Sequence, residues 1–510
     1  MAASLSLVDL PEGAVLQRAA GTSARDVPVR FTHRGAVGQG APGGSSGGVQ
    51  ARVVRAGIAA AVVVDWSPLT KVVLRGGAGS GLLPNVPQGD GYRLELRHGE
   101  DAASVSRGTS AWGVGVNVLF QGQSNMLSTL AGGWSGYVVP GTGLYEQDLY
   151  PRRGKAFRVF DGAGWHEPSN ARGAVNTLTN CIFGFGRLLT EALARQHGAV
   201  VPVGLIPFAQ NAVSIDAMLP PKGPVYTGMF AADGDGTRGG PAGLESDIYG
   251  GDFEMAFYHQ GEADVGRPTA EYMERLKALY RLYLGHTARF GRDAATLPFG
   301  VAVVGNLDPE VGLGVETIRT AQIGFVNWAK ANGWPRVDLG WSTVDLPRAD
   351  PYHFGGDEVQ RRSMRRMLLT ARRFLGVSPH GGRGPRAAGA TIRGDVIDVA
   401  VQHGGGTGLR LADPARPPTG FYLSEDGFTT VRYLRPRSVA LAGPSVVRIT
   451  LASVPAGAVS VHYQNAAPRS PEACNPDIGN PVYDDTVVPE DGLGLPLQPT
   501  PAPLVARRAT

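Results

Sequence analysis

The sequence predicts an α/β domain with a parallel sheet, flanked by a β domain on each side. From about residue 113 to 376, apolar β-prone runs alternate with helical segments long enough to cover such a sheet. Outside this region, short β-prone runs alternate with glycine and proline turns, a pattern typical of antiparallel β structure. The 510 residues include 73 glycines and 38 prolines, so several domains with many turns are expected.

These changes of pattern divide the chain into six segments. They are an N-terminal segment with a Gly/Ser-rich connector (1–48), a small β domain (49–112), the α/β domain (113–376), a Gly/Pro/Arg-rich linker (377–388), a sandwich-like β domain (389–466) and a Pro-rich tail (467–510). Because of its prolines, we expect the tail to be extended or to lie as a strap over a neighbouring surface.

The α/β domain contains strand and helix patterns in alternation. The expected strands are 115–120, 200–208, 253–259 and 297–305, and the expected helices are 182–197, 269–289, 316–331 and 357–375. Such a series predicts a parallel sheet with helices on both faces and a ligand site at the carboxyl ends of the strands.

The distribution of charged residues and cysteines argues against nucleic-acid binding, a disulfide framework and a metal site. The net charge is +4 without a dense basic run, which does not favour a nucleic-acid-binding protein. The arginines of residues 361–373 are spaced to lie on one helix and are interpreted as a solvated face. Cys181 and Cys474 lie far apart without a metal-ligand pattern, so neither a disulfide framework nor a metal site is expected.

The sequence also bears on location. Residues 1–20 lack a basic region followed by a long apolar core, so no secretory signal is expected. The most apolar stretch, 56–66, is too short to span a bilayer as a helix. These observations favour a protein of the cytoplasm, or one that belongs to a phage-like particle released by lysis.

The residues that could carry chemistry follow predicted strands. Ser124 comes directly after the first strand, within the run GQSNM. Asp350 and His353 are three residues apart in DPYH, close enough for the carboxylate to orient the imidazole as a base. Gln260, in HQGE, can direct an amide N–H at a developing oxyanion. Ester hydrolysis by a serine needs these three functions.

The blocks GQSNM, HQGE and DPYH, in this order, resemble the signature blocks of the SGNH hydrolase superfamily. The most similar branch is the sialate O-acetylesterase-like carbohydrate esterases, and the resemblance covers residues 114–376. It implies a flavodoxin-like α/β/α fold and no metal or other cofactor. By position it implies that Ser124 is the nucleophile, that Asp350 and His353 complete the relay, and that the Gln260 side chain and the Ser124 backbone N–H hold the oxyanion.

One position departs from the family pattern. Members usually have a glycine pair after a VGLI-type strand, and here Asn211 and Ala212 occupy that place. Each still has a backbone N–H for the oxyanion hole, but their Cβ atoms restrict φ and narrow the pocket.

Other residues near these blocks have two interpretations. Candidates for substrate binding are Gln123, Asn125, Trp134, His259 and Glu262. For Glu262 a structural acceptor role is favoured, His259 is interpreted as pocket lining rather than a second base, and Trp134 either stacks on a sugar or packs locally. Ser124 alone could also cap the helix that follows it.

The sequence therefore predicts a serine esterase that removes O-acetyl groups from a poly- or oligosaccharide without a cofactor. Three alternatives remain open. The first is a lipase or peptidase of the same fold, which would use the same triad. The second is a glycan-binding protein whose SGNH domain has weak or lost activity, and the third is a phage-type spike or fibre that carries this domain. The expected partner is an O-acetylated glycan, with a homo-oligomer or a virion or surface assembly as the wider context.

Overall fold

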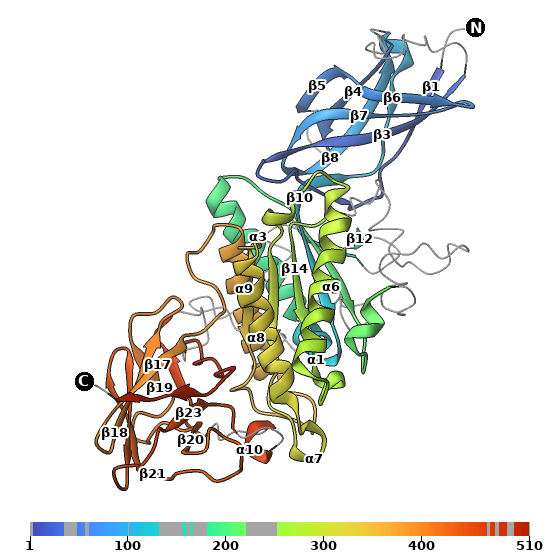
Figure 1. Cartoon of the computed structure of the whole chain (residues 1–510). Coiled ribbons are helices and arrows are strands. Elements are labelled where there is room, and N and C mark those ends of the chain that lie inside the picture. Colours follow the sequence, from blue (N-terminus) through green and yellow to red (C-terminus); the bar gives the residue numbers. More distant parts are fainter. Residues whose placement is uncertain are drawn as a thin grey trace.

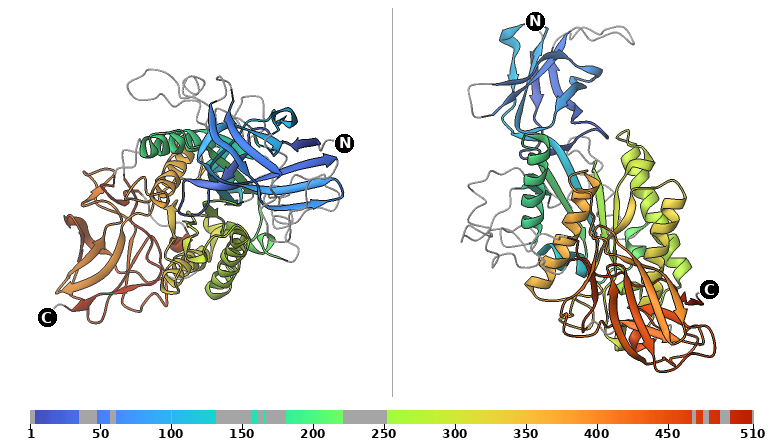
Figure 2. Two further views of the ribbon diagram at one scale, coloured as in Figure 1. Left: turned by 90° about the horizontal axis from the view of Figure 1, so that it is seen from above. Right: turned by 90° about the vertical axis from the view of Figure 1, so that its left-hand side faces the viewer.

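The computed structural model describes residues 4–34, 48–56, 61–99, 101–131, 157–160, 165–166, 181–220, 252–466, 470–474, 479–486 and 494–508. The described chain forms an N-terminal β domain, a central α/β domain and a C-terminal β domain (Figure 1). Figure 2 shows from a second direction that the central domain lies between the other two, with the chain ends at opposite extremes.

The N-terminal β domain contains two groups of strands. One antiparallel sheet has the order β1 (Ser4–Val8), β3 (Ala24–Arg34), β7 (Ala78–Pro87) and β6 (Thr70–Arg75). The second group is β2 (Val15–Gln17), β4 (Val49–Arg55), β5 (Val62–Pro68), β8 (Gly89–His98) and β9 (Ser106–Arg107). Residues 4–34 were expected to precede this domain, but their strands are part of it. The expected connector at 35–48 lies almost wholly outside the described residues.

The described part of the central domain contains six parallel strands. Their order is β11 (Phe157–Phe160), β13 (Val203–Ala209), β10 (Trp112–Gly122), β14 (Met255–His259), β15 (Phe299–Val303) and β16 (Val337–Ser342). The short β12 (Trp165–His166) pairs antiparallel with β11 at one edge. The parallel sheet expected from the alternating pattern is therefore present, with β11, β12 and β16 as strands that the sequence analysis did not identify.

Helices cover both faces of this sheet. On one face lie α1 (Ser124–Ala131), α3 (Cys181–His197) and α9 (Asp357–Phe374), and on the other lie α6 (Thr269–Ala288) and α8 (Val315–Ala331). The alternation of side chains along β10 illustrates the two cores, because Phe120 packs with the first group and Leu119 with the second. The short helices are η1 (Ala102–Ser104), η2 (Ile215–Met218), η3 (Glu262–Asp264), η4 (Ala294–Thr296), α7 (Pro309–Gly312) and α10 (Pro471–Cys474).

Strand β10 joins the first two domains. All eleven of its residues are buried. Its first half pairs with β2 and β8, and its second half pairs with β13 and β14. At Gly115 a Cβ would lie 1.9 Å from the carbonyl oxygen of Pro202, so only glycine allows this contact. The strand therefore extends beyond the expected 115–120 and crosses the expected domain boundary at residue 112.

The C-terminal β domain has three small sheets around one apolar core. Their strands are β17 (Arg386–Arg393), β18 (Val396–Gln402), β19 (Leu409–Leu411), β20 (Phe421–Ser424), β21 (Pro436–Gly443), β22 (Val446–Leu451), β23 (Ser460–Tyr463), β24 (Val482–Asp484), β25 (Leu504–Val505) and β26 (Arg507–Arg508). The last three come from the expected Pro-rich tail and pair with β19, β23 and β17. The described part of the tail is thus built into this domain.

A buried ion pair of the central domain is linked to the C-terminal domain through Tyr483. Arg366 and Asp345 are both buried, and their side chains form two hydrogen bonds of 2.7 and 2.9 Å. The Tyr483 hydroxyl and the Arg362 guanidinium also donate to Asp345, at 3.0 and 3.2 Å. Although burial alone would raise it, the pKa of Asp345 lies below its usual value because Arg366 stabilises the carboxylate. The interpretation of this arginine cluster as a solvated face is therefore wrong for Arg366, which points into the domain contact.

Replacing Arg366 should reveal the cost of removing the buried partner of Asp345. We expect Arg366→Met to lower the free energy of unfolding by up to about 3–5 kcal/mol, because Asp345 loses both hydrogen bonds from Arg366 and keeps only those from Arg362 and Tyr483. The matched control is Arg448→Met, which breaks the half-exposed pair with Asp398 and should cost at most about 1 kcal/mol. Denaturant titrations would measure both, and equal losses would contradict the structural role of Arg366.

Candidate active site

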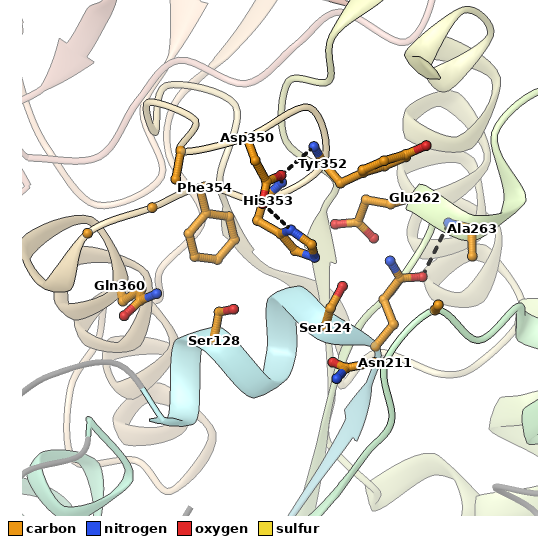
Figure 3. A pocket seen from close by; sticks show the side chains of 15 residues that line it. Ser124, Ser128, Asn211, Glu262, Ala263, Asp350, Tyr352, His353, Phe354 and Gln360 are labelled. Atoms are coloured by element: carbon orange, nitrogen blue, oxygen red, sulfur yellow. Dashed lines mark hydrogen bonds and ion pairs between the residues drawn. The ribbon is translucent and has the colours of Figure 1, made fainter. Parts of the chain in front are cut away.

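The candidate active site lies where several loops follow the carboxyl ends of the parallel strands. A cavity of about 760 Å³ opens there. Ser124 follows β10, Asn211 and Ala212 follow β13, and Glu262 follows β14. Asp350 and His353 come from the loop between β16 and α9 and line the same cavity (Figure 3). Residues almost 230 positions apart are therefore brought to one edge of the sheet, as open α/β sheets typically do.

The turn that presents Ser124 is held tightly to the sheet. A Cβ at Gly122 would lie 2.1 Å from the His259 carbonyl oxygen, so glycine is needed for this approach. The backbone N–H of Gln123 donates to the same His259 carbonyl oxygen at 3.0 Å. The Gln123 carbonyl in turn accepts the backbone N–H of Met126. Helix α1 then begins at Ser124, which places the serine at the positive end of the helix.

Asp350 and His353 form a local dyad. The distance from His353 Nδ1 to Asp350 Oδ2 is 2.7 Å, and Asp350 Oδ1 accepts the N–H groups of Tyr352 and His353 at 2.8 Å each. Desolvation opposes ionisation, but the hydrogen bonds from His353 and the two N–H groups lower the pKa of Asp350. The carboxylate therefore accepts the Nδ1 proton and leaves the other ring nitrogen free to act as a base.

The hydroxyl of Ser124 points toward the His353 ring (Figure 3). Among the described residues the hydroxyl makes no hydrogen bond, so capping of α1 by Ser124 has no support. Ser128 lies one helical turn further along α1 and lines the same cavity. The two serines share a helix face because they are four residues apart.

The turn at Asn211 and Ala212, where the resemblance to SGNH hydrolases would place a glycine pair, lies beside Ser124. The Gln210 N–H donates to the Gly122 carbonyl at 3.1 Å, which holds the end of β13 against the serine turn. Ala212 has a φ of 54°, in the left-handed region that glycine adopts readily. The backbone geometry associated with glycine is thus present at Ala212, at a cost of about 1–2 kcal/mol for the Cβ atom.

Gln260 does not reach the cavity, which corrects its expected role as an oxyanion donor. Its amide nitrogen donates to Asp264 Oδ2 at 2.6 Å and to the Val213 carbonyl at 3.2 Å, so both N–H bonds are used. Its amide oxygen accepts the hydroxyls of Tyr258 and Tyr272 at 2.8 Å each. Gln260 therefore belongs to a buried polar network on the far side of the strand end.

The expected substrate-binding residues separate into two groups. Gln123 and Glu262 line the cavity, whereas Asn125 and His259 are buried behind it. The Asn125 amide donates to Glu262 Oε1 and to the Tyr352 carbonyl, so it supports the pocket wall without facing the cavity. Trp134 lies outside the described residues.

His259 is enclosed by aromatic rings and is not pocket lining. Its ring stacks on Phe354 with centroids 5.8 Å apart. Burial lowers the pKa of His259 to about 3, so the ring is neutral. Burial also raises the pKa of Glu262, and the hydrogen bond from Asn125 partly offsets this effect. The Glu262 carboxylate remains at the cavity wall.

Sequence reasoning missed four side chains larger than alanine that line the cavity: Ser128, Tyr352, Phe354 and Gln360. Two of them carried a usable signal. Tyr352 stands inside the DPYH block, and Ser128 is four residues after Ser124 on one helix. No cluster of metal-ligating side chains occurs among the described residues. None of the described helices is long and apolar enough to span a membrane.

Comparison with family models and with curated proteins gave no match, whereas comparison with solved structures gave several. A carbohydrate acetylesterase from Xanthomonas citri is 18% identical and aligns over 98% of this chain and 99% of its own, with a TM-score of 0.57. A protein from Arabidopsis thaliana is 16% identical over 51% of this chain and 98% of its own, with a TM-score of 0.33. A carbohydrate esterase family 2 enzyme with a carbohydrate binding domain, from Corynascus thermopiles, is 14% identical over 73% of this chain and all of its own, with a TM-score of 0.31. The chain therefore has the overall fold of the Xanthomonas acetylesterase along nearly its whole length.

Proposed function

We propose that this protein is a serine esterase that removes O-acetyl groups from a carbohydrate. The observation that carries the proposal is the meeting of Ser124 with the His353–Asp350 dyad in one open cavity. The spacing of 2.7 Å within the dyad and the lowered pKa of Asp350 suit a histidine that acts as a base.

In the proposed reaction, His353 takes the Ser124 proton while the serine oxygen attacks the acetyl carbonyl carbon. Collapse of the tetrahedral intermediate breaks the ester bond, and His353 gives the proton to the leaving sugar oxygen. Water, activated by the same histidine, then attacks the acetyl-serine, which releases acetate and restores Ser124. Atoms and charges balance in these reaction steps without a cofactor.

The oxyanion requires donors other than the Gln260 side chain. The backbone N–H of Ser124, at the start of α1, is one candidate. The turn at Asn211 and Ala212 supplies further N–H groups, and both residues line the cavity next to Ser124. The left-handed conformation of Ala212 supports a turn that directs its N–H groups as a glycine pair would.

The strand order supports an SGNH hydrolase of flavodoxin-like fold. Without the edge strands β11 and β12, the order in the sheet is β13, β10, β14, β15 and β16. Counted along the chain this is the order second, first, third, fourth, fifth, which is typical of flavodoxin-like sheets. A carbohydrate substrate is proposed because the Xanthomonas protein of the same fold is described as a carbohydrate acetylesterase. The sialate O-acetylesterase-like branch stays a prediction from the sequence blocks.

Acetate release from a panel of O-acetylated polysaccharides and aryl acetates would test the proposal. We expect Ser124→Ala to lower kcat by a factor of about 10⁴ or more, because the nucleophile is lost. Ser128→Ala, which changes the other serine of the cavity, should lower it by no more than about tenfold. Circular dichroism would verify that both variants fold. A wild-type protein that releases no acetate from any substrate would refute the esterase and favour a glycan-binding protein.

The dyad can be tested through its carboxylate. Asp350→Asn keeps the size of the side chain but removes the charge that orients His353, so we expect kcat to fall about 10²–10⁴-fold. The control, Asp395→Asn, changes a partly exposed aspartate of the C-terminal domain that lies 3.7 Å from Arg437. Steady-state kinetics on an aryl acetate would measure both variants. Full activity of Asp350→Asn would assign the orienting role to a different group.

The turn at Ala212 offers a test of the oxyanion hole. Ala212→Gly keeps the left-handed conformation and should retain at least the wild-type kcat. Ala212→Val puts a β-branched residue at positive φ, which should displace the turn and lower kcat by about 10²-fold. Equal kcat values for Ala212→Gly and Ala212→Val would show that this turn does not hold the oxyanion.

A further inference from the structure

Tyr352 is the most exposed aromatic side chain among the described residues. Its exposed fraction is 44%, and the other described tyrosine, tryptophan and phenylalanine side chains are half-buried or buried. The ring nevertheless lines the cavity that contains Ser124. A flat apolar surface that stays in water at the mouth of a cavity is available to cover an equally flat ligand.

The backbone of Tyr352 is fixed on both sides. Its N–H donates to Asp350 Oδ1 at 2.8 Å. Its carbonyl accepts the amide of Asn125 at 3.1 Å, and Asn125 is itself buried and bound to Glu262. Since the residue is held in place before any ligand arrives, little backbone freedom is lost when its ring is covered.

The ring lies on the side of the site where the leaving group must depart. Its centroid is 6.3 Å from that of the His353 ring. Because His353 returns the proton to the leaving oxygen, the alcohol part of the ester lies on the histidine side of Ser124. Figure 3 shows Tyr352 and Glu262 together on one side of the His353 ring.

Polar groups accompany this aromatic surface. Glu262 lines the cavity, its side chain is almost fully buried, and its buried Oε2 accepts no hydrogen bond from the described residues. Gln123 also lines the cavity, and its amide oxygen accepts the Ala263 N–H at 3.3 Å. A ring face next to a carboxylate and an amide suits a ligand with one apolar face and several hydroxyl groups, such as a pyranose, better than an acyl chain.

We propose that Tyr352 is the platform on which the pyranose ring of the leaving sugar stacks, and that it selects acetylated sugars over acyclic acetates. Glu262 and Gln123 would bind the hydroxyl groups at the edge of that ring. The inference rests on the proposed esterase function and adds the position that determines its substrate class.

The test compares two substrates that carry the same acetyl group. One is a mono-O-acetylated methyl glucopyranoside, whose other hydroxyl groups are free, and the other is glycerol triacetate, which has no ring. For Tyr352→Leu we expect the ratio of kcat/KM for the pyranoside to kcat/KM for the triacetate to fall about tenfold, mainly through a higher KM. Tyr352→Phe keeps the flat ring and should keep the wild-type ratio. An unchanged ratio in Tyr352→Leu, or an equal loss in Tyr352→Phe, would overturn the proposal.

A binding measurement separates this proposal from the esterase itself. Calorimetry with the pyranoside in the Ser124→Ala background would give the Kd without turnover. We expect the further change Tyr352→Leu to raise this Kd about tenfold. Weaker binding together with an inactive wild type would refute the esterase but retain the platform. Equal Kd values would refute the platform even if the wild type is active.

Discussion

The burial of strand β10 is the constraint on which the rest of the structure depends. All eleven residues of the strand are buried, and it pairs with β2, β8, β13 and β14. A buried strand must satisfy its backbone groups through its neighbours, so two domains are joined along one ladder. The same strand ends at Gly122, whose close contact with β14 sets the position of Ser124. The fold of the N-terminal domain and the location of Ser124, the proposed nucleophile, are thus linked by one element.

Around Ser124, exposed groups are supported by buried polar ones. The dyad of Asp350 and His353 is partly exposed and is held by hydrogen bonds within the loop of residues 350–353. Behind it, Asn125 connects Glu262 to the Tyr352 carbonyl, so the pocket wall and the dyad loop share one support. Hydrogen-bond partners that are already in place do not have to reorient when charge develops in a reaction. Preorganised sites stabilise developing charge in this way.

Local patterns allowed much of the fold and part of the site to be predicted from the sequence. The helices near 182–197, 269–289, 316–331 and 357–375 agree with α3, α6, α8 and α9 to within about one residue, because their apolar period is a local property. Ser124 and the pair Asp350 and His353 were identified for a similar reason. A strand end and a spacing of three residues are visible without knowledge of the fold.

The sequence alone determined the class of the central domain and the types of residue that follow its strands, because period, spacing and residue type are properties of short segments. Only the tertiary structure decided which of these side chains face the cavity. Gln260 points into a hydrogen-bond network with Tyr258 and Asp264, and Arg366 turns inward to a carboxylate of the domain contact. The pairing of residues 15–17 with β10 and the left-handed φ of Ala212 likewise depend on distant partners. Such partners are brought together by packing between segments far apart in the chain, which no local pattern records.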